Sequence, residues 1–195
     1  MALVYSQATL TPGKQELVEA WLPRQPWFPG GTGWRPVGSY RFDDPAGEVG
    51  LEAMILRGDD GVTLHVPLTY RGEAAPGAGS FLVGRMEHSV LGTRWVYDGV
   101  GDPVWRLALA TAIVTGADQA EILVEADGER VRRGPTTTVL GSGSPGSPVP
   151  PPADLDLVVV RVVGEEVGAD ETLTATWTDG GAAPVTMVVA GLSRR

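Results

Sequence analysis

The chain has 195 residues, of which 43% are hydrophobic and 20% charged, a composition typical of a globular protein with a sizeable core. The formal net charge of -9 argues against nucleic acid and anionic membrane surfaces as general partners, because the overall field would repel both. The absence of cysteine excludes disulfides and thiolate chemistry, and 27 glycines and 16 prolines favour short strands joined by many turns.

The first residues lack the basic region and the long apolar run of a secretory signal. No stretch approaches the roughly 20 apolar residues that are needed to cross a bilayer. Together with the lack of cysteine, these features predict a cytoplasmic location and no membrane partner.

Short strands dominate the first half of the predicted structure. Residues 2–10 alternate as a strand, and a helix is expected from residue 12 up to Pro23, which stops it. The proline- and glycine-rich loop that follows is expected to plug an edge of the core with Trp27 and Phe28. The other strands of this half are expected at residues 34–42, 49–56, 62–68, 81–87 and 93–98, with a glycine turn between the second and third.

One helix has both of its ends specified locally. Asp102 is a good N-cap, Pro103 suits the first helical position, and Gly116 can adopt the left-handed conformation that ends a helix. Its apolar stripe is expected to contain Val104, Leu107, Ala108, Thr111 and Val114, widened by Trp105, Leu109, Ala112 and Ile113. Such a helix must be covered on most sides, so the sequence predicts an α+β fold in which the strands surround a central helix.

A β-rich extension is expected after Gly116. A hairpin is predicted at 120–126 and 129–133, and the low-complexity segment 141–152 is expected to be a flexible, exposed loop. Strands at 155–163, 173–178 and 185–192 are expected to dock onto the main sheet, to pair with the hairpin, or to form a small separate subdomain. The predicted division of the chain is therefore 1–116 and 117–195.

Catalytic signatures are absent from the sequence, including phosphate-binding loops, nucleophile elbows and metalloprotease motifs. A zinc site would need His65 and His88 brought together with carboxylates, although the alternation around His65 favours a structural role. His88 and a nearby carboxylate could form a general acid-base pair. Alternatively, Glu87, His88 and Arg94 tie two strands together while Asp98 caps a turn. No catalytic residue, metal or cofactor is predicted.

Aromatic side chains suggest a second kind of site. Tryptophan rings stack on sugar faces, so the six tryptophans could include a carbohydrate platform, although most of them are also explained as packing residues. A ligand site on the concave side of the sheet would contain His88, Arg94, Trp95, Tyr97 and Asp98.

Three short motifs occur at residues 19–28, 64–71 and 96–103. The first, E-A-W-L-P-R-Q-P-W-F, resembles the W-L-x-x-Q-R-W-F opening of bacterial maltokinases, with Pro26 in place of the usual arginine. The second is similar to a strand ending in a Pro-Leu step, and the third to a Tyr-Asp-Ala-x-x-Asp-Pro segment before a helix. In this order, the motifs resemble the N-terminal cap domain of maltokinases over residues 10–116.

The resemblance implies a curved antiparallel sheet around a helix, cystatin-like in appearance, of the kind that precedes a kinase core. The sequence has neither a kinase catalytic loop nor a D-F-G motif, so the resemblance implies a cap-like module without catalysis. Its expected role is protein interaction or regulation, linked to trehalose and α-glucan metabolism or to a kinase in trans. The expected partner is another protein or a second copy paired through a sheet edge. The alternative is a small-molecule or carbohydrate-binding protein with weak or no enzymatic activity.

Overall fold

Two central strands that are buried on both faces organise the main sheet. β4 (Gly50–Arg57) and β5 (Thr63–Arg71) form the predicted hairpin, and nearly every residue of both is buried. A strand that is covered on both faces needs a nearly continuous apolar sequence, which the runs L-E-A-M-I-L and L-H-V-P-L provide. The prediction of this hairpin is confirmed.

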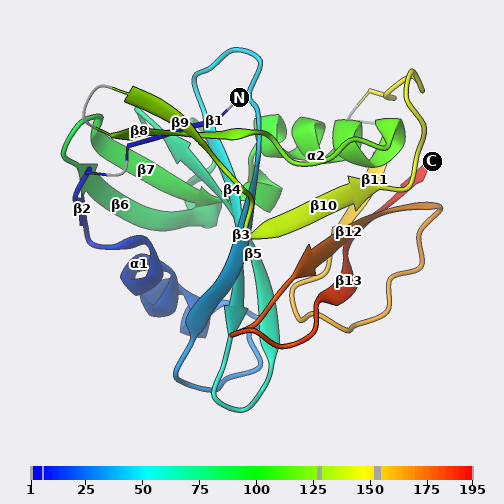
Figure 1. Ribbon diagram of the computed structural model, residues 1–195, viewed down its shortest axis with the longest axis horizontal. Helices are drawn as coiled ribbons and strands as arrows, with labels where there is room; N and C mark the ends of the chain where they lie inside the picture. Colours follow the sequence, from blue (N-terminus) through cyan, green and yellow to red (C-terminus); the bar gives the residue numbers. More distant parts are fainter. Residues whose placement is uncertain (1, 6, 127–128, 152–154, 195) are drawn as a thin grey trace.

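The computed structural model describes residues 2–5, 7–126, 129–151 and 155–194. It is a mostly-sheet α+β fold in which a strongly curled antiparallel sheet has the order β2-β6-β7-β5-β4-β3 (Figure 1). Its remaining strands are β2 (Leu10–Thr11), β3 (Arg35–Phe42), β6 (Leu82–His88) and β7 (Gly92–Asp98). The described α-helices are α1 (Lys14–Trp21) and α2 (Pro103–Thr115), and short 3-10 helices occur at Leu22–Arg24, Gly79–Phe81 and Gly99–Gly101.

Two smaller sheets complete the fold. The four-stranded sheet has the order β10-β12-β13-β11, with β10 (Thr137–Gly141), β11 (Leu155–Val159), β12 (Glu171–Trp177) and β13 (Val185–Arg194). The three-stranded sheet has the order β1-β8-β9, with β1 (Ala2–Tyr5), β8 (Ile122–Ala126) and β9 (Glu129–Arg133). β8 and β9 form the predicted hairpin, whose turn at Asp127-Gly128 lies outside the described residues.

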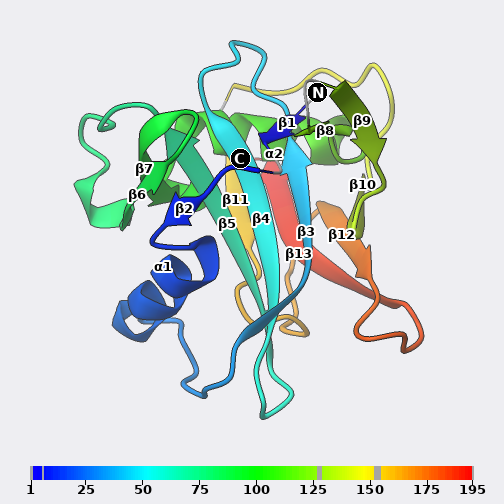
Figure 2. The same cartoon turned by 60° about the vertical axis from the view of Figure 1, so that its left-hand side comes forward.

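The six-stranded sheet has two different neighbours on its two faces, because successive residues of a strand point to opposite sides. One face, here the α1 face, carries Met54, Leu56 and Val66 and packs against α1. The other, the α2 face, carries Tyr40, Ala53 and Ile55 and packs against α2 and the four-stranded sheet. Figures 1 and 2 show α1 and the four-stranded sheet on opposite sides of β3, β4 and β5.

The ends of α2 and most of its predicted buried face are confirmed, but Leu107 and Thr111 are not buried. The Asp102 side chain accepts a hydrogen bond from the Val104 N–H, and Gly116 has the left-handed conformation at the C-cap. Leu107, however, is 46% exposed and Thr111 is exposed as well. The buried residues are Trp105, Leu109, Ala110, Ala112, Ile113 and Val114. The helix therefore packs against the two larger sheets and leaves a narrow strip around Leu107 and Thr111 exposed.

The single strand predicted over residues 2–10 is divided into two. β1 pairs in parallel with β8, whereas β2 pairs with β6 in the six-stranded sheet. A hydrogen bond from the Ala8 N–H to the Tyr5 carbonyl turns the chain between them. The apolar alternation is continuous through this turn, which is why it predicted one strand.

The C-terminal strands form a sheet together with β10. The sequence analysis did not predict the strand β10. The segment 141–152 contains no helix or further strand among its described residues, but its beginning is attached to α2. The Gly143 and Ser144 N–H groups donate to the carbonyls of Ile113 and Val114. A side chain at Gly143 would overlap the Val114 carbonyl, so glycine is required at this close approach.

The segment after β11 extends the main sheet. The predicted strand 155–163 leaves the four-stranded sheet after Val159, and residues 161–163 continue along β5. There the His65 N–H donates to the Arg161 carbonyl and the Val163 N–H donates to the Thr63 carbonyl. One hydrophobic cluster also contains residues from both sides of position 116.

Candidate functional site

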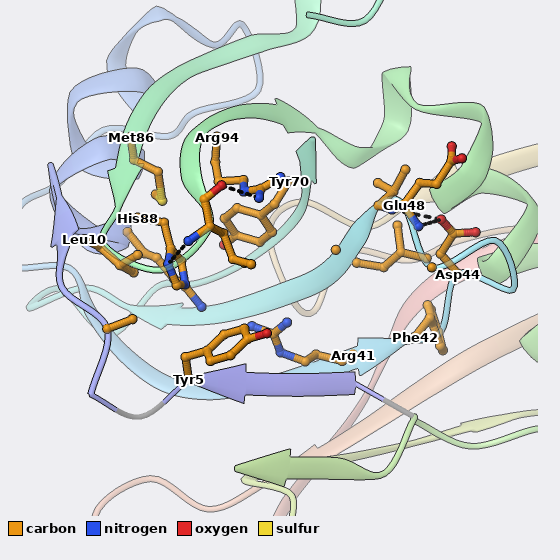
Figure 3. A pocket seen from close by; sticks show the side chains of 17 residues that line it. Tyr5, Leu10, Arg41, Phe42, Asp44, Glu48, Tyr70, Met86, His88 and Arg94 are labelled. Atoms are coloured by element: carbon orange, nitrogen blue, oxygen red, sulfur yellow. Dashed lines mark hydrogen bonds between the residues drawn. The ribbon is translucent and has the colours of Figure 1, made fainter. Parts of the chain in front are cut away.

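A cavity of about 450 Å³ opens on the α1 face, beyond the part of that face that α1 covers. Its wall combines the ends of β3, β4 and β5 with the tip of the β6–β7 hairpin, the start of α1 and the residues around β1 (Figure 3). Gly50 contributes no side chain opposite Tyr70, and this leaves room above the sheet. The volume lies within the range of small-molecule sites.

A buried carboxylate lies beneath one wall of the cavity. Glu52 Oε2 accepts hydrogen bonds from Lys14 Nζ at 2.6 Å, the Arg41 guanidinium at 3.0 Å and the Tyr70 hydroxyl at 2.9 Å. Burial alone would raise the pKa of Glu52, but the charges of Arg41 and Lys14 and the hydrogen bonds from Lys14 and Tyr70 hold it at about 2. One oxygen of a single carboxylate therefore holds two cations in place.

His88 and Arg94 contribute a second group of donors to the cavity wall. His88 Nδ1 accepts from the N–H groups of Val90 and Leu91, both at 3.2 Å, so the neutral ring carries its proton on Nε2. Burial and the positive charges of Arg94 and Lys14 lower the pKa of His88. The Arg94 guanidinium donates to the Leu91 carbonyl, while its buried Nε has no hydrogen-bond partner.

A structured turn with two carboxylates forms the other end of the cavity. Asp44 accepts hydrogen bonds from the N–H groups of Ala46, Glu48 and Val49, so its carboxylate shapes the turn that carries Glu48. Figure 3 places Asp44 and Glu48 on the far side of the cavity from His88 and Arg94. Among the apolar lining residues, Leu10, Met86 and Leu91 lie on the side of His88, whereas Phe42, Val49 and Leu51 belong to the hydrophobic cluster of the α2 face.

Of the five residues proposed from the sequence, His88 and Arg94 line this cavity and the other three do not. Trp95 and Tyr97 lie on the opposite face of β7, where Trp95 stacks on Arg85 and the Tyr97 hydroxyl accepts from the Ala75 N–H. The structure thus does not bring the five side chains together.

Asp98 has a structural environment. Its carboxylate accepts hydrogen bonds from the Val100 N–H and from Arg161, whose guanidinium also lies over the Trp27 ring. Asp98 therefore caps its turn, as the alternative interpretation expected, and joins the aromatic loop to the C-terminal part of the chain. Trp27 and Phe28 pack at the edge of the α1-face cluster, which confirms their predicted place.

Neither histidine has the partners that its proposed chemistry needs. In the described part of the chain, His88 accepts hydrogen bonds from two backbone N–H groups and donates none to a carboxylate. His65 is fully buried between Tyr40 and the Val160 carbonyl on the α2 face. Among the described residues, no group of three or more His, Cys, Asp or Glu side chains could hold a metal ion.

Most tryptophans are packing residues. Four of them are buried, each at most 5% exposed, and therefore offer no flat face to a sugar: Trp21, Trp34, Trp105 and Trp177.

No described helix is long and apolar enough to cross a membrane.

The residues missed from the sequence are Tyr5, Lys14, Arg41, Glu52 and Tyr70. One contact among these residues could have been expected from the predicted strands. Arg41 and Glu52 are direct partners across β3 and β4. A carboxylate in the middle of the apolar strand L-E-A-M-I-L also indicates a buried charge that needs a cation.

Residues 21–102 match the family model of the maltokinase N-terminal cap domain. This segment is similar to the maltokinase N-terminal cap domain. It begins at the last residue of α1 and ends at the N-cap of α2, so it contains β3 to β7 and most of the cavity wall. The match is narrower at both ends than the expected range 10–116. No curated protein matches the chain.

Proposed function

We propose that the chain acts as a non-catalytic, cap-like module that binds and regulates a protein partner. The observation that supports this role is the match of residues 21–102 to the maltokinase N-terminal cap domain. The proposed partner is a kinase in trans or another protein of trehalose and α-glucan metabolism, in the cytoplasm of a bacterium. We also propose that the curled sheet is cystatin-like.

An exposed sheet edge provides a place for such a partner. β9 lies at the end of the three-stranded sheet, and all five of its residues are exposed. An edge strand has unpaired backbone groups that can pair with a strand of another chain. Val131, at the centre of β9, is 59% exposed. A second copy of the chain or the regulated protein would add a strand here.

The test uses a maltokinase from the same source, purified without its own cap. We expect it to form a complex with the chain on a sizing column with light scattering, and its maltose-dependent ATP turnover to change in the complex. Val131→Lys places a charge on the edge and is expected to weaken the complex at least tenfold. Leu107→Lys, at an apolar residue of similar exposure on α2, is the matched control.

Two results would contradict the proposal. One is a lone monomer at 100 μM that forms no complex with the cap-deleted kinase. The other is ATP turnover by the chain alone that a single substitution in this chain abolishes, because that result would make the module an enzyme.

The cavity favours a second candidate function, the binding of a small molecule or carbohydrate. The specific observation is an opening of about 450 Å³ lined by both polar and apolar side chains. A ligand at 100 times its dissociation constant stabilises the fold by about 2.7 kcal/mol, which a thermal shift detects. We expect such a shift with a ligand that enters the cavity, and no shift after Gly50→Trp, which fills it.

A further inference from the structure

One end of the cavity has an excess of positive charge. Lys14 and Arg41 share the single carboxylate of Glu52, so this group retains a net charge of one positive unit. Lys14 forms one of its possible hydrogen bonds to Glu52, and Arg41 donates to the same oxygen. Their remaining N–H groups are available to a further acceptor.

Arg94 adds a second uncompensated charge. In the part of the chain that the structure describes, no carboxylate lies within ion-pair distance of its guanidinium. Within the described residues, its guanidinium donates to the Leu91 backbone carbonyl, and its buried Nε has no partner. The charge of Arg94 is thus held at the cavity wall without a carboxylate partner among the described residues, and an anion would compensate it.

The remaining polar groups also favour an acceptor. The Nε2–H of His88 is a donor, because its Nδ1 already accepts two backbone N–H groups. The carboxylate of Asp44 is occupied by three backbone N–H groups at the other end of the cavity. The Glu48 carboxylate lies with Asp44 at that far end, so the cavity has a cationic and an acidic end. Leu10, Met86 and Leu91 form the apolar wall beside the cationic end.

We propose that this cavity binds a small phosphate monoester, with the phosphate at Lys14, Arg41 and Arg94 and the organic group against the apolar wall. A phosphate dianion has three terminal oxygens and two charges, which match two guanidinium groups and an ammonium better than a single carboxylate does. A neutral sugar would leave the excess charge uncompensated. The inference rests on ligand binding in the cavity, the second function proposed above.

The test measures binding of three probes by titration calorimetry at low ionic strength: phenyl phosphate, inorganic phosphate and glucose. We expect phenyl phosphate to bind most tightly, inorganic phosphate at least fivefold more weakly, and glucose undetectably at 10 mM. Arg94→Gln and Lys14→Met are each expected to weaken phenyl phosphate binding at least tenfold. Arg85→Gln, on the neighbouring strand but on the opposite face, is the matched control and is expected to bind like the unmodified chain.

The pKa of His88 gives a second readout. It would not change on addition of phenyl phosphate if Lys14 and Arg94 had only a structural role. The groups facing its ring are Lys14 on α1, Arg94 on β7 and the Tyr5 ring on β1. A bound dianion counteracts the two positive charges, so the pKa of His88 is expected to rise by at least half a unit in proton NMR spectra. The chain contains only two histidines, and His65, on the α2 face, serves as the internal reference.

Each outcome separates the two proposals. If glucose binds and phenyl phosphate does not, the phosphate inference is overturned while ligand binding in the cavity stands. If no probe binds at 10 mM to the folded chain, both are overturned. Equal binding by the Arg94→Gln, Lys14→Met and Arg85→Gln variants would place the anion elsewhere and overturn the inference. Thermal unfolding of each variant confirms that it is folded before binding is compared.

Discussion

The buried pair of His65 and Tyr40 makes the stability of the fold depend on pH in a predictable way. His65 is 0% exposed, its Nε2 lies 2.9 Å from the Tyr40 hydroxyl, and its Nδ1 lies 3.2 Å from the Val160 carbonyl. Because a carbonyl can only accept, Nδ1 carries the proton and Nε2 accepts from the tyrosine. The neutral ring is therefore fully hydrogen-bonded, and a second proton on Nε2 would displace the hydrogen bond that the Tyr40 hydroxyl donates and place a charge in a fully buried site.

Burial and the nearby charge of Arg161 lower the pKa of His65 from 6.5 to about 3. Below pH 6.5 the unfolded chain binds a proton at this position, whereas the folded chain does not until about pH 3. The stability that depends on a neutral His65 is thus fully present above pH 6.5. Below pH 6.5 this contribution to the free energy of unfolding falls by about 1.4 kcal/mol per pH unit. Between pH 7.5 and pH 5.0 the loss from His65 is about 2 kcal/mol.

The assay is urea unfolding at pH 7.5, 6.5, 5.5 and 5.0 for the unmodified chain, His65→Gln and His88→Gln. We expect His65→Gln to be less stable at pH 7.5 but to lose less than half as much stability on acidification. His88→Gln is expected to retain most of the loss, since His88 is only partly buried. Folding lowers the pKa of Glu52 from 4.5 to about 2, so the stability that depends on its charge is lost only below about pH 4.5. The range stops at pH 5.0 to exclude this second contribution.

Two observations would refute this reasoning. The first is a His65 resonance in the folded chain that titrates near pH 6.5. The second is an equal loss of stability in His65→Gln and the unmodified chain. Tyr40→Phe, which removes the donor to Nε2, is expected to cost about 1–3 kcal/mol at pH 7.5.

Three further substitutions test other parts of the fold. Glu52→Gln leaves two partly buried cations without their counter-charge and is expected to cost about 2–3 kcal/mol in urea unfolding at pH 7, with a smaller loss of stability below pH 4.5 than the unmodified chain. Asp102→Ala removes the N-cap of α2 and the paired hydrogen bonds from Arg71, and a drop of about 2–4 kcal/mol is expected; a cost under 1 kcal/mol would contradict this role. Gly143→Ala overlaps a backbone carbonyl of α2 and is expected to lower the unfolding midpoint strongly, whereas Gly168→Ala, which meets no atom within 4 Å, is expected to shift it little.

The sequence predicts best what is decided locally. Asp102 and Gly116 fixed the ends of α2, because caps act within one turn. The same helix has one charge after its cap, Arg106, so its sequence gives no polar side from which to orient it. Which face is buried depends on β10, β12 and β13, which follow later in the chain, and Leu107 is therefore exposed against expectation.

β10 was missed although a signal for it exists. Thr137, Val139 and Gly141 are buried and alternate with exposed residues, and β-branched residues favour strands. The adjoining glycine- and serine-rich segment made the whole region resemble a loop. A short strand beside low-complexity sequence can be recognised only by its alternation.

Strand geometry explains why only His88 and Arg94 of the five predicted site residues line the cavity. Residues 94 and 95 of one strand point to opposite faces, so Arg94 and Trp95 could not both line one cavity. This could have been seen from the predicted strand. The partners of Arg94 in the cavity wall, Lys14 and Arg41, come from α1 and from β3, and their convergence requires the strand order of the sheet.

Contacts across position 116 link the cap-like segment to the C-terminal residues. Arg161 pairs with Asp98 and lies over Trp27, so the C-terminal part holds two elements of the matched segment together. The strand pairing of residues 161–163 with β5 and the shared hydrophobic cluster on the α2 face act in the same direction. Because these contacts involve the central strand β5, the sheet that bears the cavity depends on residues that follow the family match. The cap-like segment and the later strands are thus expected to gain and lose their structure together.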